Sequence, residues 1–255
     1  MAILLVYHRG PMVIVNLGSG SRTSPYCINV DWSPYLRLKS NRLGSRIAPL
    51  VLRGNRRERF LDLDDTILIH DLRRPLPLPD DVADAVYHSH VLEHFDRRFV
   101  APFLAEIRRV LKPGGIHRVV VPDFEASCRR YLAHLDSCAA PTTQDEAAEN
   151  EHDEYVGEVI EQMVRRESTG TSQQRGVRRV IENLVFGDAR RRGETHQWMY
   201  DRVNLAHALR RAGFHDISLV DYKTSSIAGW DEIRLDEREG GDEYIVGSLY
   251  MEAVK

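Results

Sequence analysis

The sequence is short of cysteine and of long apolar runs, and both shortages narrow the function classes open to it. Its three cysteines, Cys27, Cys128 and Cys138, are widely separated and form no C-x-x-C pair, so we expect ordinary thiols and no cysteine-ligated zinc or dithiol redox centre. The apolar run from Met1 to Tyr7 is too short for a signal peptide or a membrane span. We therefore expect a cytoplasmic protein that makes no membrane contact.

The chain also lacks a large net charge of either sign. The formal net charge is −3 and the sequence pI is about 6.4, which gives no overall attraction to the phosphates of nucleic acids. At 255 residues with 42% hydrophobic content, the chain is large enough to bury one sizeable core. We expect a single domain over residues 1–255, with nucleic acid an unlikely class of partner.

The chain also lacks the third glycine of a dinucleotide-binding fingerprint. An apolar strand runs into Gly18 and Gly20, and a second apolar strand ends at Asp31. The two glycines let the backbone approach a ligand closely, and a carboxylate at a strand end can accept both hydroxyls of a ribose. A G-x-G-x-x-G motif needs glycine where Thr23 stands, and its acid follows about 20 residues later. The pattern favours an adenosine-containing ligand and fits NAD poorly.

The first half of the chain alternates between apolar segments typical of buried strands and one amphipathic helix. The helix is predicted over Arg97–Leu111 and ends at Lys112-Pro113-Gly114-Gly115. A strand, helix and strand in succession predict a parallel sheet. Only nine residues separate the first two strands, so the helix between them must be short or absent. The predicted strands are Val13–Leu17, Cys27–Asp31, Thr66–Leu72, Ala83–His88 and Ile116–Val121.

The end of the chain returns to regular structure after a long irregular stretch. A helix is predicted over Asp201–Arg211, followed by strands at Asp216–Tyr222 and Tyr244–Ala253. The polar, glycine-bearing segment Ser225–Asp242 between these strands predicts a long hairpin loop. This arrangement gives the sheet an antiparallel edge.

A basic segment, Tyr35–Arg59, carries eight arginines and lysines against one acid, Glu58. The simplest interpretation is a solvated helix and loop. A nucleic-acid groove would add aromatic side chains for stacking, and here only Tyr35 and Phe60 stand at the edges. An anionic small substrate or a protein partner remains an alternative.

An insertion, Phe124–Thr195, breaks the strand and helix rhythm, and its charges are segregated into an acidic block followed by arginine blocks. A pair of helices with a disordered joint near Thr169–Gln174 explains this composition. Inserts of this length are typical of lids and binding loops. A solvated appendage or a contact between copies, such as a homodimer, is the alternative.

Five motifs stand out along the first half of the chain. They are V-I-V-N-L-G-S-G at 13–20, N-V-D at 29–31, H-D-L at 70–72, A-D-A-V-Y-H-S-H-V-L-E-H at 83–94 and E-I-R-R-V-L-K-P-G-G at 106–115. Taken together they resemble class I S-adenosylmethionine (SAM)-dependent methyltransferases of the type 11 kind. The resemblance covers Val13–Asp123 and resumes through His196–Gly213 and the last strand. The L-E-H motif followed by R-V-L-K-P-G-G is its most specific part.

The resemblance implies an α/β fold with a Rossmann-like seven-stranded mixed sheet and a mainly helical insertion after the fifth strand, here residues 124–195. It also implies SAM at the carboxyl ends of the first strands. By position, the glycine loop borders the methionine part, Asp31 accepts the ribose hydroxyls, and His88 and Ser89 lie near the methionyl group. The implied cofactor-binding residues are Asn16, Gly18, Ser19, Gly20, Asp31, Trp32, Asp71, Leu72, His88 and Ser89.

Two positions depart from the family pattern. Asn16 stands where the family usually has an acid for the cofactor's ammonium group, and Arg22 stands where a third glycine is common. Because hydrogen bonds to a charged group are about twice as strong as neutral ones, the amide predicts modest cofactor affinity.

Candidate catalytic and substrate-binding residues follow the fourth and fifth strands and the end of the insertion. An oxygen acceptor of high pKa needs a base, and the candidates are His90, Asp123 and His196. For each of them an ordinary hydrogen-bonding or packing role is the alternative. Trp198 and Tyr200 are candidate walls of the substrate pocket, because aromatic side chains supply large apolar contacts.

The histidines and the acid around residue 90 also allow a metal interpretation. His88 and His90 would share a face of a strand, and imidazoles with a carboxylate suit zinc or iron. In the methyltransferase interpretation Glu93 and His94 instead cap and anchor the following helix. We expect no metal on this basis.

Three functions remain open. The favoured one is methyl transfer from SAM to an oxygen or nitrogen of a small molecule, such as a sugar or secondary metabolite, in a biosynthetic reaction. A cofactor-binding protein without turnover is suggested by Asn16 and by the absence of a clear base. An RNA or protein methyltransferase is suggested only by the basic segment.

Overall fold

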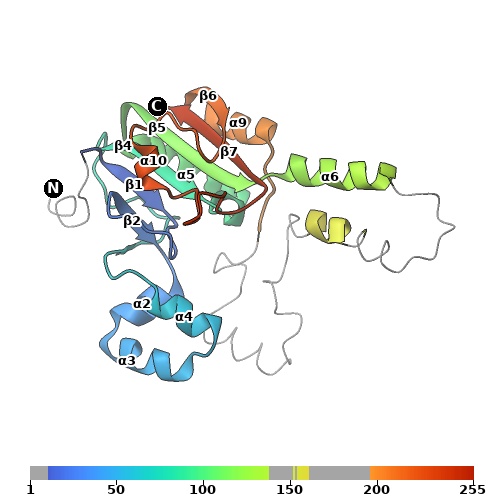
Figure 1. The fold of residues 1–255 in the computed structure, drawn as a ribbon. Helices are drawn as coiled ribbons and strands as arrows, with labels where there is room; N and C mark the ends of the chain where they lie inside the picture. Colours follow the sequence, from blue (N-terminus) through green and yellow to red (C-terminus); the bar gives the residue numbers. More distant parts are fainter. Residues whose placement is uncertain (1–10, 138–151, 153, 161–195) are drawn as a thin grey trace.

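The computed structural model describes residues 11–137, 152, 154–160 and 196–255, and these residues contain one seven-stranded sheet (Figure 1). The sheet order is β3-β2-β1-β4-β5-β7-β6. β1 to β5 run parallel, and β7 is antiparallel to both β5 and β6. The mixed sheet is therefore as predicted. Its strands are β1 (Ile14–Leu17), β2 (Cys27–Asp31), β3 (Leu68–Ile69), β4 (Ala83–Ser89), β5 (Leu111–Pro122), β6 (His215–Val220) and β7 (Ser248–Val254).

Eight helical elements have defined bounds among the described residues. Three short helices lie between β2 and β3, where one solvated helix with a loop was predicted. The helices are α2 (Pro34–Ser40), α3 (Arg42–Val51), α4 (Asn55–Leu61), η1 (Leu92–His94), α5 (Arg97–Val110), α6 (Phe124–Ser137), α9 (Arg202–Arg211) and α10 (Trp230–Ile233). β3 is shorter than its predicted span because only Leu68 and Ile69 pair with β2.

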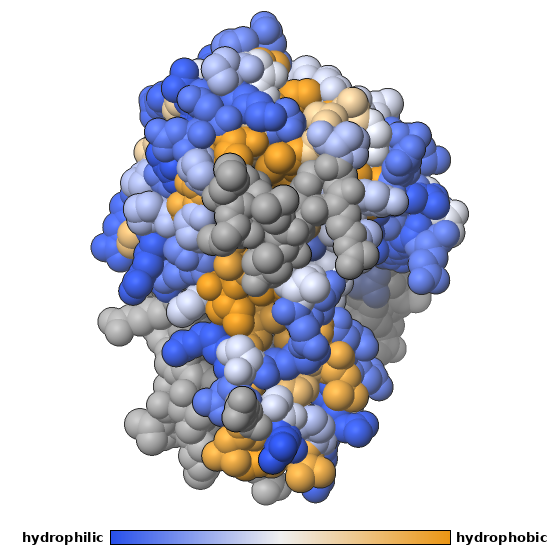
Figure 2. All heavy atoms as spheres, turned by 90° about the vertical axis from the view of Figure 1, so that its left-hand side faces the viewer, coloured by the Kyte–Doolittle hydropathy of each residue, from blue (hydrophilic) through white to orange (hydrophobic). Residues whose placement is uncertain are grey.

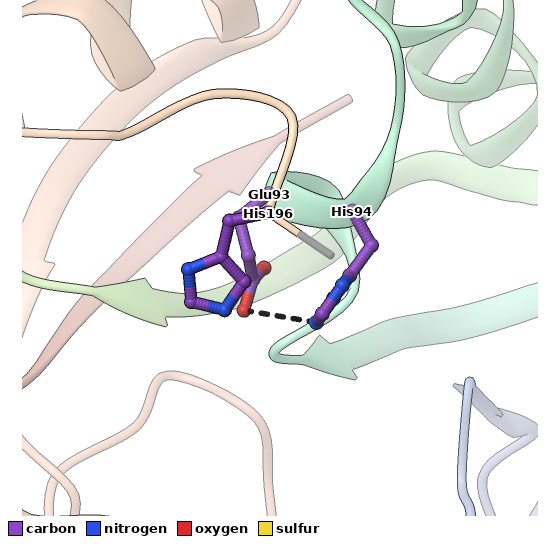
Figure 3. Close-up of side chains that lie close together, drawn as sticks. All are labelled: Glu93, His94 and His196. Carbon is purple, nitrogen blue, oxygen red and sulfur yellow. Dashed lines mark ion pairs between the residues drawn. The ribbon is translucent and has the colours of Figure 1, made fainter. Parts of the chain in front are cut away.

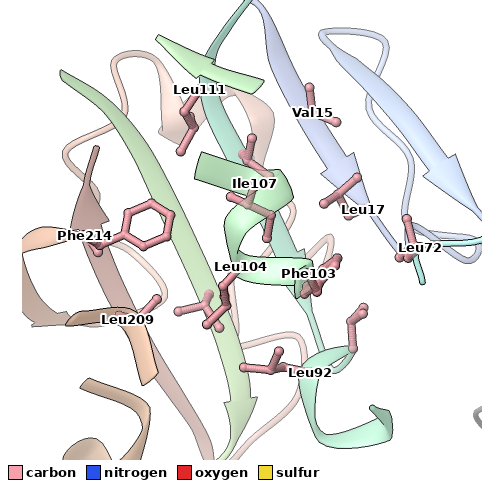
Figure 4. Packing of buried hydrophobic residues seen from close by; sticks show 14 of the residues in the cluster. Val15, Leu17, Leu72, Leu92, Phe103, Leu104, Ile107, Leu111, Leu209 and Phe214 are labelled. Atoms are coloured by element: carbon pink, nitrogen blue, oxygen red, sulfur yellow. The ribbon is translucent and has the colours of Figure 1, made fainter. Parts of the chain in front are cut away.

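One face of the sheet packs on α5 and α9, and this layer holds the larger hydrophobic core (Figure 4). α5 begins at Asp96, whose side chain accepts from the backbone N–H of Arg98, and its apolar stripe is buried against β1, β4 and β5. α9 begins with a capping box between Asp201 and Asn204. Both helices match their predicted spans to within a residue.

The opposite face is covered by the connection between β6 and β7, which includes α10. No helix forms between β1 and β2, as the nine-residue spacing predicted. Ile227, Trp230 and Leu235 of the connection are buried against Ile14, Ala85 and other apolar residues of this face. The long connection between two antiparallel strands is as predicted. Its short helix and its buried apolar residues were not expected, because these residues are spaced too irregularly to show a period.

A buried charge network fixes this connection to the sheet. Arg118 of β5 is fully buried and pairs with Asp236 and Glu252, each at 2.8 Å. Its guanidinium also donates to the carbonyl oxygens of Asp221 and Thr224. Tyr87 donates to the other oxygen of Asp236 at 2.6 Å. Every partner is hydrogen-bonded, which is the condition under which buried charges are tolerated.

Several surface features complete the fold. α6 points away from the sheet (Figure 1), and residues 154–160 are helical, whereas the predicted joint at 169–174 lies outside the described residues. The helical insertion as a whole stays a prediction.

Figure 2 shows apolar side chains at the lower end of the molecule, where Leu43, Leu50 and Val51 of α3 are exposed. No helix within the described ranges is long and apolar enough to cross a bilayer.

The described cysteines behave as ordinary thiols. Cys27 lies in the core of the sheet, and burial raises the pKa of its thiol to about 12. Burial also raises the pKa of Cys128. A thiolate is the reactive form of cysteine, so neither side chain is an activated nucleophile at neutral pH. Cys138 lies outside the described residues.

Candidate active site

The loop after β1 has a backbone shape that requires glycine. Gly18 and Gly20 have φ angles of +68° and +52°. A Cβ on Gly18 would collide with the side chain of Val91, whereas one on Gly20 would meet no atom within 4 Å. The N–H groups of Gly18 and Ser19 donate to the carbonyl oxygen of Val30 at the end of β2. The loop is therefore held close to β2, as its two glycines predicted.

Asp31 ends β2 beside this loop. The backbone N–H of Trp32 donates to Oδ1 of Asp31 at 2.7 Å, and the N–H of Gly20 also donates to the carboxylate. Burial raises the pKa of Asp31 above its ordinary value, although these two hydrogen bonds oppose the rise. The carboxylate thus lies at the mouth of the parallel strands, where ligands bind in open α/β sheets.

A cavity of about 530 Å³ connects these residues. Gly18 to Arg22 and Asp31 form one wall, and Ser89 at the end of β4 lies at another. Ser19 contributes a buried hydroxyl that has no hydrogen-bond partner among the described residues. The volume lies within the range of about 300–1,000 Å³ that is typical of small-molecule sites.

Arg22 joins the glycine loop to the β6–β7 connection, which supplies the third wall. Its guanidinium donates to the carbonyl oxygens of Arg234, Leu235 and Glu237. It also lies 4.4 Å from the ring centre of Tyr244, and Leu235 and Tyr244 both line the cavity. The arginine that replaces a family glycine therefore holds a wall of the cavity in place, a role that the sequence alone did not reveal.

Five of the ten implied cofactor residues, Gly18, Ser19, Gly20, Asp31 and Ser89, line the cavity together. The other five do not. Asn16 is buried behind the loop, where its amide donates to the carbonyl of Arg22 and to Oδ1 of Asn29. It holds the loop together, and its Nδ2 is already occupied.

The remaining implied cofactor residues make other contacts. Trp32 is partly exposed, with Arg37 over its ring at 4.9 Å. Asp71 holds Arg73 through two hydrogen bonds of 2.8 Å, and Leu72 is buried in the main core. The contacts of Trp32, Asp71 and Leu72 with the cofactor stay predictions.

His88 belongs to the hydrophobic core. Its ring is fully buried, with centroids 5.4 Å from Phe103 and 5.0 Å from His117. Burial lowers the pKa of His88 to about 4, although the charge of Glu93 opposes this. The ring is therefore neutral at neutral pH. It points to the α5 side of the sheet, whereas Ser89, the next residue, faces the cavity.

The predicted catalytic and substrate-binding residues fall into two groups. Asp123 occupies the start of α6, where Oδ1 accepts from the N–H of Ala126. Tyr200 is buried in the main core next to it, and burial raises its pKa. Trp198 is half-buried, with the guanidinium of Arg97 4.1 Å from its ring centre. The other group, His90 and His196, lies around Glu93.

Glu93 is the centre of a histidine cluster at the carboxyl end of β4 (Figure 3). Its Oε1 lies 3.3 Å from Nδ1 of His90 and 3.8 Å from Nε2 of His94. The rings of His94 and His196 meet edge to face at 4.9 Å. Burial would raise the pKa of Glu93, but His90, His94 and His196 outweigh it and lower the pKa to about 2.

The cluster does not have the capping role that we expected for Glu93 and His94. α5 is capped by Asp96, so the carboxylate of Glu93 does not cap that helix. Only its main-chain carbonyl anchors a neighbour, by accepting from the N–H groups of Gln197 and Trp198. The spacing of His90, Glu93 and His94 was visible in the sequence, but nothing there showed that His196 lies beside them.

Comparison with known proteins agrees with the resemblance over part of the chain. Residues 26–119 match the family model described as a methyltransferase domain. The strand order, with β7 antiparallel between β5 and β6, is the class I methyltransferase arrangement implied by the resemblance. The predicted resemblance to class I SAM-dependent methyltransferases is thus confirmed over residues 26–119, and the predicted fold is confirmed.

Solved structures similar to this chain share little sequence with it. A SAM-dependent methyltransferase from Mesorhizobium loti has 20% identity and a TM-score of 0.43, covering 96% of this chain and 92% of its own. One from Archaeoglobus fulgidus has 14% identity and a TM-score of 0.41, covering 100% and 92%. Phosphoethanolamine N-methyltransferase 2 from Haemonchus contortus, solved with SAM, has 14% identity and a TM-score of 0.41, covering 100% and 51%. No curated protein matches this chain.

Proposed function

We propose that this methyltransferase binds SAM in the cavity beside Asp31 and transfers its methyl group to an oxygen or nitrogen of a small molecule, such as a sugar or secondary metabolite. The observation that carries the proposal is the position of the Asp31 carboxylate at a cavity that the glycine loop also lines. The homodimer, the cytoplasmic location and the role of residues 124–195 as a lid stay predictions.

The residues present fit SAM. Asp31 would accept the ribose hydroxyls, and the backbone at Gly20 lines the cavity at a position where even a Cβ would meet no protein atom within 4 Å. The unpartnered hydroxyl of Ser19 is available for a polar atom of the ligand. When bound, SAM supplies an electrophilic methyl group on a positively charged sulfur. Asn16, which holds the loop, is not placed to give a charged contact.

The chain contributes mainly by positioning. Holding an acceptor in line with a methyl donor, in a site closed to water, accounts for up to roughly 7–11 kcal/mol of barrier reduction in well-oriented systems. The wall formed by Leu235, Tyr244 and Ile245 reduces solvent access on one side. None of His90, Asp123 and His196 is among the residues that line the cavity, so a proton acceptor for a hydroxyl group stays a prediction.

The basic segment Tyr35–Arg59, which includes α3 and most of α2 and α4, supports an anionic acceptor over a neutral one. Tyr35 of α2 and Leu63, just beyond α4, line the cavity, so this basic part of the chain borders its entrance. Arg37 of α2 and Arg57 of α4 are exposed. An RNA acceptor is the second candidate, and it predicts binding that weakens steeply with salt.

Binding and turnover test the proposal separately. Isothermal titration with S-adenosylhomocysteine (SAH), the demethylated cofactor, should give one site per chain. Incubation with methyl-labelled SAM and a panel of sugars, phenols and amines, neutral and anionic, should then label one class. Absence of SAH binding would overturn the cofactor assignment. Tight SAH binding without labelling of any small molecule, RNA or protein would favour a cofactor-binding protein without turnover.

A further inference from the structure

A buried carboxylate without a hydrogen-bond partner is the least expected feature of the domain. Glu93 is 1% exposed, and neither of its oxygens has a hydrogen-bond partner in the described part of the chain. An ionised carboxylate withdrawn from water costs several kcal/mol unless it is paired or coordinates a cation. Histidines surround it at ion-pair distance without making a hydrogen bond of normal geometry.

The surrounding side chains are the types that bind a divalent transition metal. Glu93, His94 and His196 each offer a ligand atom, and these atoms all lie within 4.8 Å of one another. His90 adds an imidazole nitrogen 3.3 Å from Oε1 of Glu93. Ligands about 2.0–2.2 Å from a tetrahedral zinc ion lie about 3.4 Å apart. To reach that spacing, the partly exposed histidine rings would have to rotate toward Glu93.

The backbone around the cluster is shaped for this arrangement. His90 is a non-glycine residue with a φ angle of +54°, a conformation that costs about 1–3 kcal/mol and gathers at functional sites. It directs the ring of His90 toward Glu93 and away from the core, where His88 lies. The next residue, Val91, packs against Gly18 of the cofactor loop. The cluster is therefore a direct neighbour of the cavity.

We propose that Glu93, His94 and His196, with His90 as a fourth ligand, form a binding site for a divalent first-row transition metal, with zinc as the best match. Imidazole nitrogens and one carboxylate suit zinc and poorly suit magnesium, which prefers oxygen ligands. His90 and His94 are 19% and 24% exposed, so solvent reaches the cluster. If the proposed function holds, an acceptor oxygen could bind the ion and lose its proton more easily.

Zinc binding to the whole protein tests the site without relying on turnover. Protein treated with chelator and dialysed should take up one zinc ion per chain by titration. Cobalt in its place should give the visible absorption of a four-coordinate site. The His94→Ala/His196→Ala double variant should lose about 100-fold or more in zinc affinity. Glu93→Gln, which keeps the side-chain shape, should weaken zinc binding as well.

Control variants separate this site from incidental binding at other histidines. His134 and His152 stack at 5.3 Å and offer a second pair of imidazoles, and His207 is exposed on α9. His134→Ala and His207→Ala should bind zinc as the parent protein does. Zinc uptake that is absent, or that survives in the double variant, would overturn the proposal, as would its loss in His134→Ala.

The metal site and the proposed function fail in different ways. SAH titration of the same variants reports on the cavity, and thermal unfolding confirms that each variant is folded. If zinc uptake depends on His94 and His196 but the protein does not bind SAH, the metal site is supported and the proposed function is wrong. If the protein binds SAH but takes up no zinc, the metal site is wrong and the proposed function stands. If Glu93→Gln does not fold, zinc titration of the His94→Ala/His196→Ala variant decides the test, because both of these histidines are partly exposed.

Discussion

Nη2 of Arg22 donates to the carbonyl oxygen of Leu235 at 3.1 Å and so joins residues 213 positions apart in the chain. The glycine loop and the β6–β7 connection thereby form two adjoining walls of the cavity. The wall formed by the β6–β7 connection is held by one guanidinium that donates to three main-chain carbonyls.

Arg22→Ala should loosen this wall. Hydrogen bonds from a charged donor contribute about 1.5–3 kcal/mol, so we expect a loss of that order in the free energy of unfolding, measured by urea denaturation. Amide hydrogen exchange should become faster over residues 234–245, and SAH affinity should fall. Arg211→Ala, on the exposed side of α9, is the control and should change none of these. Unaltered exchange in residues 234–245 would contradict the role of Arg22.

Gly18→Ala should be more harmful than Gly229→Ala, although both residues have positive φ angles, +68° and +71°. Left-handed backbone costs an alanine about 1–2 kcal/mol at either position. Only Gly18 adds a collision with Val91, and overpacking of this kind costs about 1–3 kcal/mol more. Urea denaturation should show the difference. The double variant Gly18→Ala/Val91→Ala should relieve the collision and leave the backbone strain. Equal losses of unfolding free energy in Gly18→Ala and Gly229→Ala would contradict this account.

Asp31→Asn should weaken SAH binding by about 10- to 100-fold, because a charged acceptor for the ribose is lost. Burial raises the folded-state pKa of Asp31. The resulting stabilisation is present below the unfolded pKa and is lost as the pH rises through the folded pKa. At pH 7 the ionised Asp31 is therefore unfavourable for stability, and calorimetry should show a higher Tm for Asp31→Asn. In the parent protein, SAH affinity should fall as the pH drops through the raised pKa.

Asp64→Asn is the matched control, because its pKa is shifted in the opposite direction. Backbone donation from Thr66 lowers the pKa of Asp64, so its ionised form stabilises the fold above the unfolded pKa and this is lost on acidification. At pH 7 Asp64→Asn should lower the Tm and leave SAH affinity unchanged. If both variants shift the Tm in the same direction, burial is not what sets the pKa of Asp31.

Arg118→Met should lower the free energy of unfolding by about 3–5 kcal/mol, because it leaves Asp236 and Glu252 buried without their cation. Neutralising the partners as well, in Arg118→Met/Asp236→Asn/Glu252→Gln, should recover part of the loss. Urea denaturation of both variants measures the difference. A triple variant less stable than the single one would show that the carboxylates are stabilised by groups other than Arg118.

The sequence predicted the elements that depend on local pattern. β2 matches its predicted span, and α5 and α9 match to within a residue, because apolar period and capping residues are local signals. The absence of a helix between β1 and β2 followed from chain length alone. The positions of Gly18, Gly20 and Asp31 around one cavity followed from the family motif.

Features that depend on contacts distant in sequence were not predicted. Arg22 was seen only as a missing glycine, because its partners lie more than 200 positions away. His88 and His90 looked equivalent on one strand, but the positive φ of His90 turns its ring away from the core. The approach of His196 to Glu93 depends on how the chain returns after residue 195, which no local pattern records.

The lack of a helix after β1 has a consequence during synthesis on the ribosome. Ile14, Ala85 and their apolar neighbours are covered by Ile227, Trp230 and Leu235, which follow every strand except β7 in the chain. A nascent chain therefore exposes this apolar face after six of the seven strands have been made. Such surfaces recruit chaperones and favour aggregation, so production of the protein should depend on how quickly translation continues from β6 to residue 235.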